Sequence, residues 1–198
     1  MTERFEIRRV CVAVAAVSLI ASVVGSISTV HAKGATGTAS ARVPHIAMPA
    51  VDPSCKVVFD ASDKTLDTPN HLYQDQTDSH GKKRVGELIT VSGERYLLVD
   101  GKWSKSRMTV AATKEQNEEN KKNAKVVTCK RIGSDSVNGQ AATVYTEHTE
   151  REDSKSDGKI WVSSSGVILK EEIDLDAGAD SKVHMTLRYE YGNVKAPI

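Results

Sequence analysis

Apolar and polar residues alternate along most of the chain after residue 84. Residues 85–91 show this period of two, and Ser92-Gly93-Glu94 and Asp100-Gly101 then turn the chain into short segments at 95–99 and 102–103. Such alternation is typical of β-strands, and Asp-Gly is a strong hairpin signal. Because tight turns join only antiparallel neighbours, we expect an antiparallel sheet with one dry and one wetter face. Further strands are predicted over 126–132, 141–148, 159–163 and 167–175, with a loop over 149–157.

The last predicted strand separates its side chains by face. One face carries Met185, Leu187, Tyr189 and Tyr191, and the other carries His184, Thr186, Arg188 and Glu190. In the preceding strand, Glu171 falls in an apolar row with Val167, Leu169, Ile173 and Leu175. A carboxylate in such a row must be paired, partly exposed or functional. Glu171 is therefore a candidate for contact with a ligand.

Two segments depart from the period of two. Val57, Val58, Ala61 and Leu66 fit an amphipathic helix that begins at Asp52 or Ser54 and ends before Thr68-Pro69, with a strand over 56–59 as the alternative. Residues 111–124 are almost all polar good helix formers. With no apolar face, this segment is predicted to be a solvated helix or a mobile excursion, and whether it forms a lid stays open.

The N-terminus has the pattern of an export signal. Arg4, Arg8 and Arg9 precede an apolar stretch over 10–24, and small residues lead to a cleavage site between Ala32 and Lys33. The alternative is a membrane anchor, but the stretch is shorter than the roughly 20 residues that a spanning helix needs. We expect a cleaved signal peptide (1–32), a flexible leader (33–53) and one domain (54–198) in the periplasm, with no transmembrane anchor after cleavage.

Charge narrows the range of partners. Removing residues 1–32 takes three basic and two acidic residues from the 27 basic and 26 acidic residues of the chain, which leaves no net charge. A neutral chain without a basic run has nothing to grip a polyphosphate backbone. We therefore expect no nucleic acid partner, and the sequence leaves the oligomeric state open.

Two cysteines remain after cleavage, Cys55 and Cys129. In an oxidising compartment an even number of cysteines favours pairing, and this link would close a long loop and contribute roughly 4 kcal/mol. The alternatives are free thiols and a redox-active pair, although the chain has no Cys-x-x-Cys spacing.

The sequence contains no recognisable motif for catalysis or for metal binding. The histidines are far apart without ligand spacing, and Ser163, Ser164 and Ser165 before Gly166 read as a turn rather than a nucleophile motif. We expect no cofactor, no metal and no enzymatic activity. The aromatic residues are mainly core candidates, and those considered for ligand contact are Trp103, Trp161, Tyr189 and Tyr191.

Several short motifs resemble those of small periplasmic proteins of proteobacteria that are distantly similar to the lipoprotein carrier LolA and its receptor LolB. These motifs are Thr68-Pro69-x-His71, Tyr96…Asp100-Gly101-Lys102-Trp103, Asn138-Gly139…Tyr145, Ile160-Trp161-Val162…Gly166-x-x-Leu169-Lys170 and Tyr189-x-Tyr191-x-Asn193-Val194-x-Ala196-Pro197. The resemblance covers most of residues 54–198. It implies an α+β fold, mainly antiparallel β, in which a strongly curved half-barrel has one or two helices over its concave face.

The resemblance also implies a non-enzymatic periplasmic carrier for an apolar ligand, a lipid or lipoprotein acyl chain. The alternative is a structural or protein-interaction domain with a filled core. An enzyme would require His71 or His148 to meet a carboxylate inside a cleft.

Overall fold

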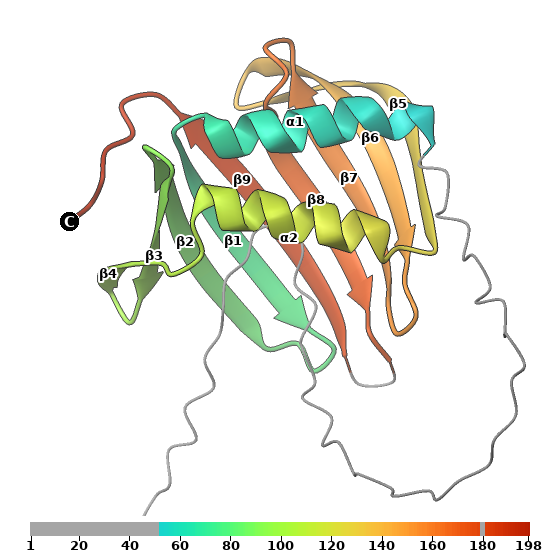
Figure 1. Cartoon of the computed structure of the whole chain (residues 1–198), viewed down its shortest axis with the longest axis horizontal. Coiled ribbons are helices and arrows are strands. Elements are labelled where there is room, and N and C mark those ends of the chain that lie inside the picture. The colour runs from blue at the N-terminus through green and yellow to red at the C-terminus, as the bar shows by residue number, and fades with distance from the viewer. Residues whose placement is uncertain (1–51, 179–180) are drawn as a thin grey trace, which may run out of the picture.

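The fold is one open antiparallel sheet with two helices across one of its faces (Figure 1). The computed structural model describes residues 52–178 and 181–198, so the predicted signal peptide, the cleavage site at Ala32 and Lys33 and nearly all of the leader lie outside the described residues. The nine strands run in the order β4-β3-β2-β1-β9-β8-β7-β6-β5, which leaves β4 and β5 as the two edges. The predicted fold class, a mainly antiparallel α+β fold with helices over a half-barrel, is confirmed.

Strand pairing joins neighbours in the chain except where β1 meets β9. The helical elements are a short 3₁₀ turn η1 (Pro53–Cys55), α1 (Lys56–Asp67) and α2 (Val110–Lys122). The strands are β1 (Asn70–Asp78), β2 (Lys83–Val91), β3 (Glu94–Val99), β4 (Lys102–Lys105), β5 (Val126–Val137), β6 (Gln140–Glu150), β7 (Lys155–Ser163), β8 (Ile168–Asp176) and β9 (Lys182–Tyr191).

The predicted first helix is confirmed, and the alternative strand over 56–59 is wrong. The Asp52 side chain accepts a hydrogen bond from the Ser54 amide at 2.9 Å and so caps the 3₁₀ turn that leads into α1. Thr68 is extended because Pro69 follows it, and the helix ends there. A disulfide between Cys55 and Cys129 fixes the start of α1 to strand β5.

The helices define a covered face of the sheet, and the opposite face is called the outer face. The main core lies on the covered face, where the register places Leu72 of β1 opposite both Leu88 of β2 and Tyr189 of β9. A smaller apolar cluster lies on the outer face and consists of Ala142, Val144, Trp161 and Leu169.

Two local predictions need correction, and one strand was not predicted. Strand β1 had no counterpart in the sequence analysis. The expected loop over 149–157 is wrong, because β6 continues to Glu150 and β7 starts at Lys155, which leaves a turn of four residues. The row that joined Leu169 to Glu171 is also wrong, because a register shift opposite Trp161 and Val162 places Leu169 in the outer-face cluster and Ile168 in the main core.

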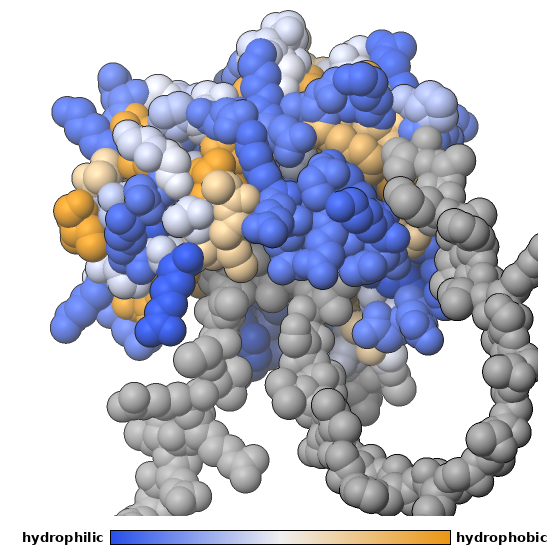
Figure 2. All heavy atoms as spheres, viewed as in Figure 1, coloured by the Kyte–Doolittle hydropathy of each residue, from blue (hydrophilic) through white to orange (hydrophobic). Residues whose placement is uncertain are grey.

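Helix α2 is a helix, as predicted, but it is not simply solvated. Its buried residues are Val110, Thr113, Asn117 and Asn120, so its underside toward the sheet is mainly polar. Figure 2 shows hydrophilic side chains over its outward side as well, with a smaller apolar patch beside α1. Neither described helix is long and apolar enough to cross a membrane.

Candidate functional site

Two hollows that share lining residues lie between the helices and the covered face, and together they are called the helix–sheet cavity. The larger hollow has a volume of about 60 Å³, and its walls include Val58, Phe59 and Ile160. The smaller hollow has a volume of about 20 Å³ and lies beside Arg95. Both are lined by Ser62, Asn117 and Ile168.

The helix–sheet cavity is small in this arrangement of the helices. A cavity must have a volume of about 10 to 15 Å³ to hold one water molecule, so the two hollows accommodate only a few waters. Pockets for small molecules typically have volumes of about 300 to 1,000 Å³. Any apolar ligand larger than a few atoms would therefore require a helix to move away from the sheet.

Glu171 and Tyr189 meet at the cavity. Glu171 is 1% exposed, and its Oε1 accepts a hydrogen bond from the Tyr189 hydroxyl at 2.7 Å. Burial raises the pKa of Glu171 to about 7, against the opposing effect of the Tyr189 hydrogen bond. Burial, and then the neighbouring Glu171, raise the pKa of Tyr189 well above its usual value. Glu171 is thus a neutral acid through much of the mildly acidic range.

Buried polar atoms without a protein partner gather at the same cavity. Of seven such side-chain atoms among the described residues, five belong to residues that line it. They are Arg95 Nε, Arg95 Nη2, Asn117 Oδ1, Asn120 Nδ2 and Arg151 Nε. Because folded proteins pair nearly all buried polar atoms, this concentration indicates a place where a partner outside the chain, water or ligand, completes the hydrogen bonding.

The other ligand candidates from the sequence lie away from the helix–sheet cavity or at its margin. Trp161 is on the outer face, where its indole nitrogen donates to Asp135 at 2.9 Å. The register also places Trp103 on the outer face, where its ring lies 5.8 Å from that of His71. The Tyr191 hydroxyl donates to the carbonyl of Ile168 beside the smaller hollow.

Sequence reasoning did not single out Arg95, Asn117, Asn120 or Arg151. For Arg95 a signal was present, because a period of two places it on the same side of its strand as Leu97, which packs against the main core. For Asn117 and Asn120 the spacing of three matches one helix face, but polarity alone does not tell which face of a polar helix is buried.

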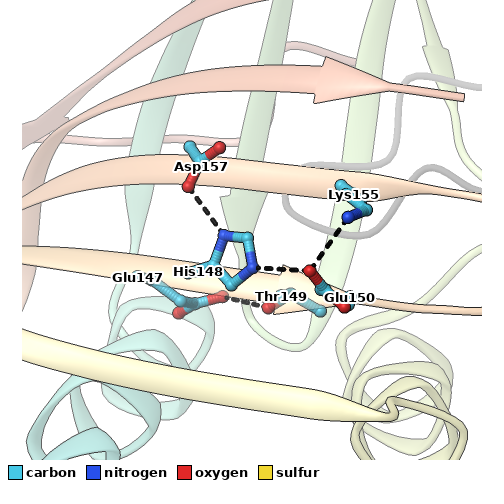
Figure 3. Close-up of polar contacts among 6 residues, drawn as sticks. All are labelled: Glu147, His148, Thr149, Glu150, Lys155 and Asp157. Atoms are coloured by element: carbon cyan, nitrogen blue, oxygen red, sulfur yellow. Dashed lines mark hydrogen bonds and ion pairs between the residues drawn. The ribbon is translucent and has the colours of Figure 1, made fainter.

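A second cluster of ionisable side chains lies on the outer face. His148, Asp157, Asp174 and His184 are opposite one another on four adjacent strands and line an open hollow of about 520 Å³. His148 Nδ1 lies 2.8 Å from Asp157 Oδ1, and His184 Nδ1 lies 2.8 Å from Asp174 Oδ1. Figure 3 shows His148 between Asp157 and Glu150, while Glu147 and Thr149 alternate with it along the strand.

The geometry around His148 is that of an ion network rather than of a catalytic base. Its Nε2 lies 3.3 Å from Glu150, which also accepts from Lys155 at 3.1 Å. The hydrogen bond to Asp157 raises the pKa of His148, so the contacts favour the charged ring. With both ring nitrogens beside carboxylates, His148 has no free nitrogen to accept a proton.

His71 is held in a comparable way, with Nε2 2.9 Å from Glu87 and Nδ1 3.1 Å from the Tyr73 hydroxyl. Within residues 52–178 and 181–198, no group of three or more His, Cys, Asp or Glu side chains is placed to hold a metal ion.

Comparisons with known proteins give structural likenesses only. No family model and no curated protein matches the chain. Among solved structures, the lipoprotein LppX of Mycobacterium tuberculosis is 11% identical with a TM-score of 0.39, over 70% of this chain and 96% of that one. MucB in complex with MucA is 14% identical with a TM-score of 0.45, over 73% of this chain and 57% of that one.

A LolA superfamily protein of Nitrosomonas europaea is 7% identical with a TM-score of 0.23, over 69% of this chain and 91% of that one.

Proposed function

We propose that this chain is an exported, non-enzymatic binding protein that holds an apolar or amphiphilic ligand, such as a lipid acyl chain, between its sheet and α2. The observation that carries the proposal is the underside of α2, which buries Thr113, Asn117 and Asn120. Asn117 and Asn120 line a cavity whose other walls include Val58, Phe59 and Ile160. A helix that only completed a core would turn apolar side chains to the sheet.

The two helices differ in how firmly they are attached. Helix α1 is joined to β5 by the disulfide, and its Thr65 hydroxyl accepts from the Ile168 amide at 2.8 Å. Helix α2 has an ion pair with α1, Lys114 to Asp67 at 2.7 Å, and the hydrogen bond from Arg95 to Thr113. An exposed ion pair of this kind contributes about 0 to 1 kcal/mol. Helix α2 is therefore the element that moves to admit a ligand.

Export supports a role outside the cytoplasm. The N-terminal signal pattern directs the chain across a membrane. The disulfide is of the kind that persists in an oxidising compartment, here taken as the periplasm.

A second candidate is a cell-envelope interaction domain whose core is filled by its own side chains. The small volume of the helix–sheet cavity, about 60 Å³ in its larger part, favours this candidate. The two candidates differ in one testable respect, since only the binding protein opens between α2 and the sheet.

The test ties α2 to α1 and measures the binding of a neutral apolar fluorophore, N-phenyl-1-naphthylamine. The paired changes Asp67→Cys and Lys114→Cys replace the ion pair that joins the helices, and a short bis-maleimide then links them. We expect the parent to bind the fluorophore and the linked variant to bind at least about tenfold more weakly, because the ligand needs α2 to move.

The matched control is Glu115→Cys with Glu119→Cys, two exposed positions one turn apart on α2, linked in the same way. This link leaves α2 free of α1, so its affinity should equal that of the parent. Absence of fluorophore binding by the parent, or equal loss in both linked variants, would contradict the proposal and favour the interaction domain.

A further inference from the structure

Arg95 is a buried cation, and two of its three guanidinium nitrogens have no hydrogen-bond partner. Its side chain is 1% exposed, and its Nη1 donates to the Thr113 hydroxyl at 2.7 Å. Its Nε and Nη2 have no partner. A guanidinium stays charged at neutral pH, and removing a charge from water is costly unless it is paired. Arg95 therefore needs a partner that the described chain does not supply.

The two unpaired nitrogens form one edge of the guanidinium. The N–H groups of Nε and Nη2 point the same way, and this fork matches the two oxygens of a carboxylate in a bidentate pair. Thr113 occupies the remaining nitrogen, Nη1, so it leaves this edge available. The geometry of the unused edge thus indicates an oxygen anion rather than a neutral acceptor.

The surroundings of Arg95 supply space but no negative charge. The hollow beside it has a volume of about 20 Å³, enough for one or two oxygen-sized groups. None of its described lining residues is acidic, and no described carboxylate forms an ion pair with Arg95. Glu171 lines the larger hollow, where its Oε1 accepts from Tyr189, and its pKa of about 7 leaves it largely uncharged in mild acid.

Arg151 is the second arginine at the helix–sheet cavity, and unlike Arg95 it has acidic side chains whose charges offset its own. Arg151 lines the larger hollow and also leaves its Nε unpaired, but the charges of Glu147 and Asp153 act on it. The cation whose charge is not offset is thus Arg95, at the smaller hollow. Both hollows are lined by Ser62, Asn117 and Ile168, so a ligand that occupied the two together would contact Arg95 as well as the apolar side chains of the larger hollow.

We propose that the Nε–Nη2 edge of Arg95 binds the carboxylate of an amphiphilic ligand whose apolar chain lies in the helix–sheet cavity, an inference that rests on the binding function proposed above. The ligand class is a long-chain carboxylic acid. Arg95 then selects the ligand by its head group, while the apolar walls hold its chain.

The test compares laurate with 1-dodecanol as competitors that displace N-phenyl-1-naphthylamine from the oxidised protein at about pH 6, where laurate is ionised and Glu171 is largely protonated. The two competitors share the same chain length and differ in the head group. We expect laurate to displace the fluorophore at a concentration at least about tenfold lower, as a charge-assisted bidentate pair would give.

Three variants assign the preference to the unpaired edge of Arg95. Arg95→Gln should bind laurate and dodecanol alike while still binding the fluorophore, and Arg95→Lys should keep part of the preference. Arg188→Gln, an exposed arginine that pairs with Asp75 away from the cavity, is the matched control and should keep the full preference. Circular dichroism identifies a variant that fails to fold.

The outcomes separate the two proposals. Equal displacement by laurate and dodecanol in the parent, or an undiminished preference in Arg95→Gln, would overturn the carboxylate site while leaving the binding function standing. A parent that does not bind the fluorophore at all would overturn both. Equal displacement by the two competitors in the parent would overturn the carboxylate site even if the Arg95 variants do not fold.

Discussion

Glu171 and Arg95 are buried ionisable side chains beside the same cavity, and neither forms an ion pair. Each is instead held by a neutral hydroxyl group, Tyr189 for Glu171 and Thr113 for Arg95. A buried carboxyl in this situation resists ionisation, because its charged form loses hydration without gaining a cation. The protein thereby keeps an acid in its interior whose protonation depends on pH in the neutral range.

The raised pKa of Glu171 predicts a loss of stability as the pH rises. The folded state holds its proton up to a pKa of about 7, whereas the unfolded chain releases it near 4.5, so the folded state binds more protons between these values. The contribution is therefore complete below pH 4.5 and is lost as the pH rises through 7. The total loss is about 3 kcal/mol.

Glu171→Gln tests this prediction, because the amide stays neutral and still offers an oxygen to Tyr189. We expect urea unfolding at a series of pH values to show a flatter profile for the variant, with greater stability than the parent in mild alkali. Glu172→Gln, on the outer face beside Lys170, is the matched control and should follow the parent. Equal pH profiles for Glu171→Gln and the parent would show that Glu171 does not carry this pH dependence.

At the scale of elements, α2 is the part of the fold whose packing departs most from expectation. Its contacts with the sheet are polar, and Asn117 and Asn120 leave atoms unpaired there. Such packing gives up stability, because an unpaired buried polar atom costs about 1 to 3 kcal/mol. A trade of stability for mobility is common where a function needs an element to move.

Asn117→Leu should make the closed arrangement of α2 more stable. The substitution removes an unpaired carbonyl oxygen and adds apolar contact at similar volume, so the free energy of unfolding should rise by about 1 kcal/mol. Affinity for N-phenyl-1-naphthylamine should fall at the same time, because opening becomes harder. Glu119→Leu, at an exposed position of α2, should change neither quantity appreciably. A more stable Asn117→Leu protein with unchanged affinity would separate α2 from the binding function.

The sequence predicted secondary structure well where apolar and polar side chains alternate strictly. It did not predict the elements whose position depends on tertiary contacts. Most strands and α1 followed from periodicity and turn signals. Strand β1 did not, because its inward residue Asn70 is polar and donates to the carbonyls of Thr65 and Thr68 at the end of α1. The register shift at Leu169 depends on the pairing of β7 with β8, which no local pattern specifies.

The candidate site was only partly foreseen for the same reason. Glu171 stood out because it interrupts an apolar row, and Tyr189 because it faces the same side. Arg95 and Asn117, which also line the helix–sheet cavity, come from a distant strand and a polar helix, and only the packing of α2 on the sheet brings them together.

At the scale of the whole molecule, the two helices are attached to the sheet with different strength. The disulfide holds the start of α1 against β5 at one edge of the open sheet. In the described part of the chain, no disulfide links α2 to the sheet. The covered face thus has one helix tied by a disulfide and one that is not, over a cavity lined by both apolar and polar side chains. The proposed binding function requires α2 to be the helix that moves, because the cavity is small in this arrangement.

The most direct test of the central claim is native mass spectrometry of the protein purified from the periplasm, followed by extraction and identification of bound molecules. The account predicts a chain that begins after Ala32, with its disulfide intact and one amphiphilic molecule bound per chain, from which a long-chain acid or lipid is recovered. A chain that carries nothing, even after incubation with lipids and fatty acids, would contradict the binding function.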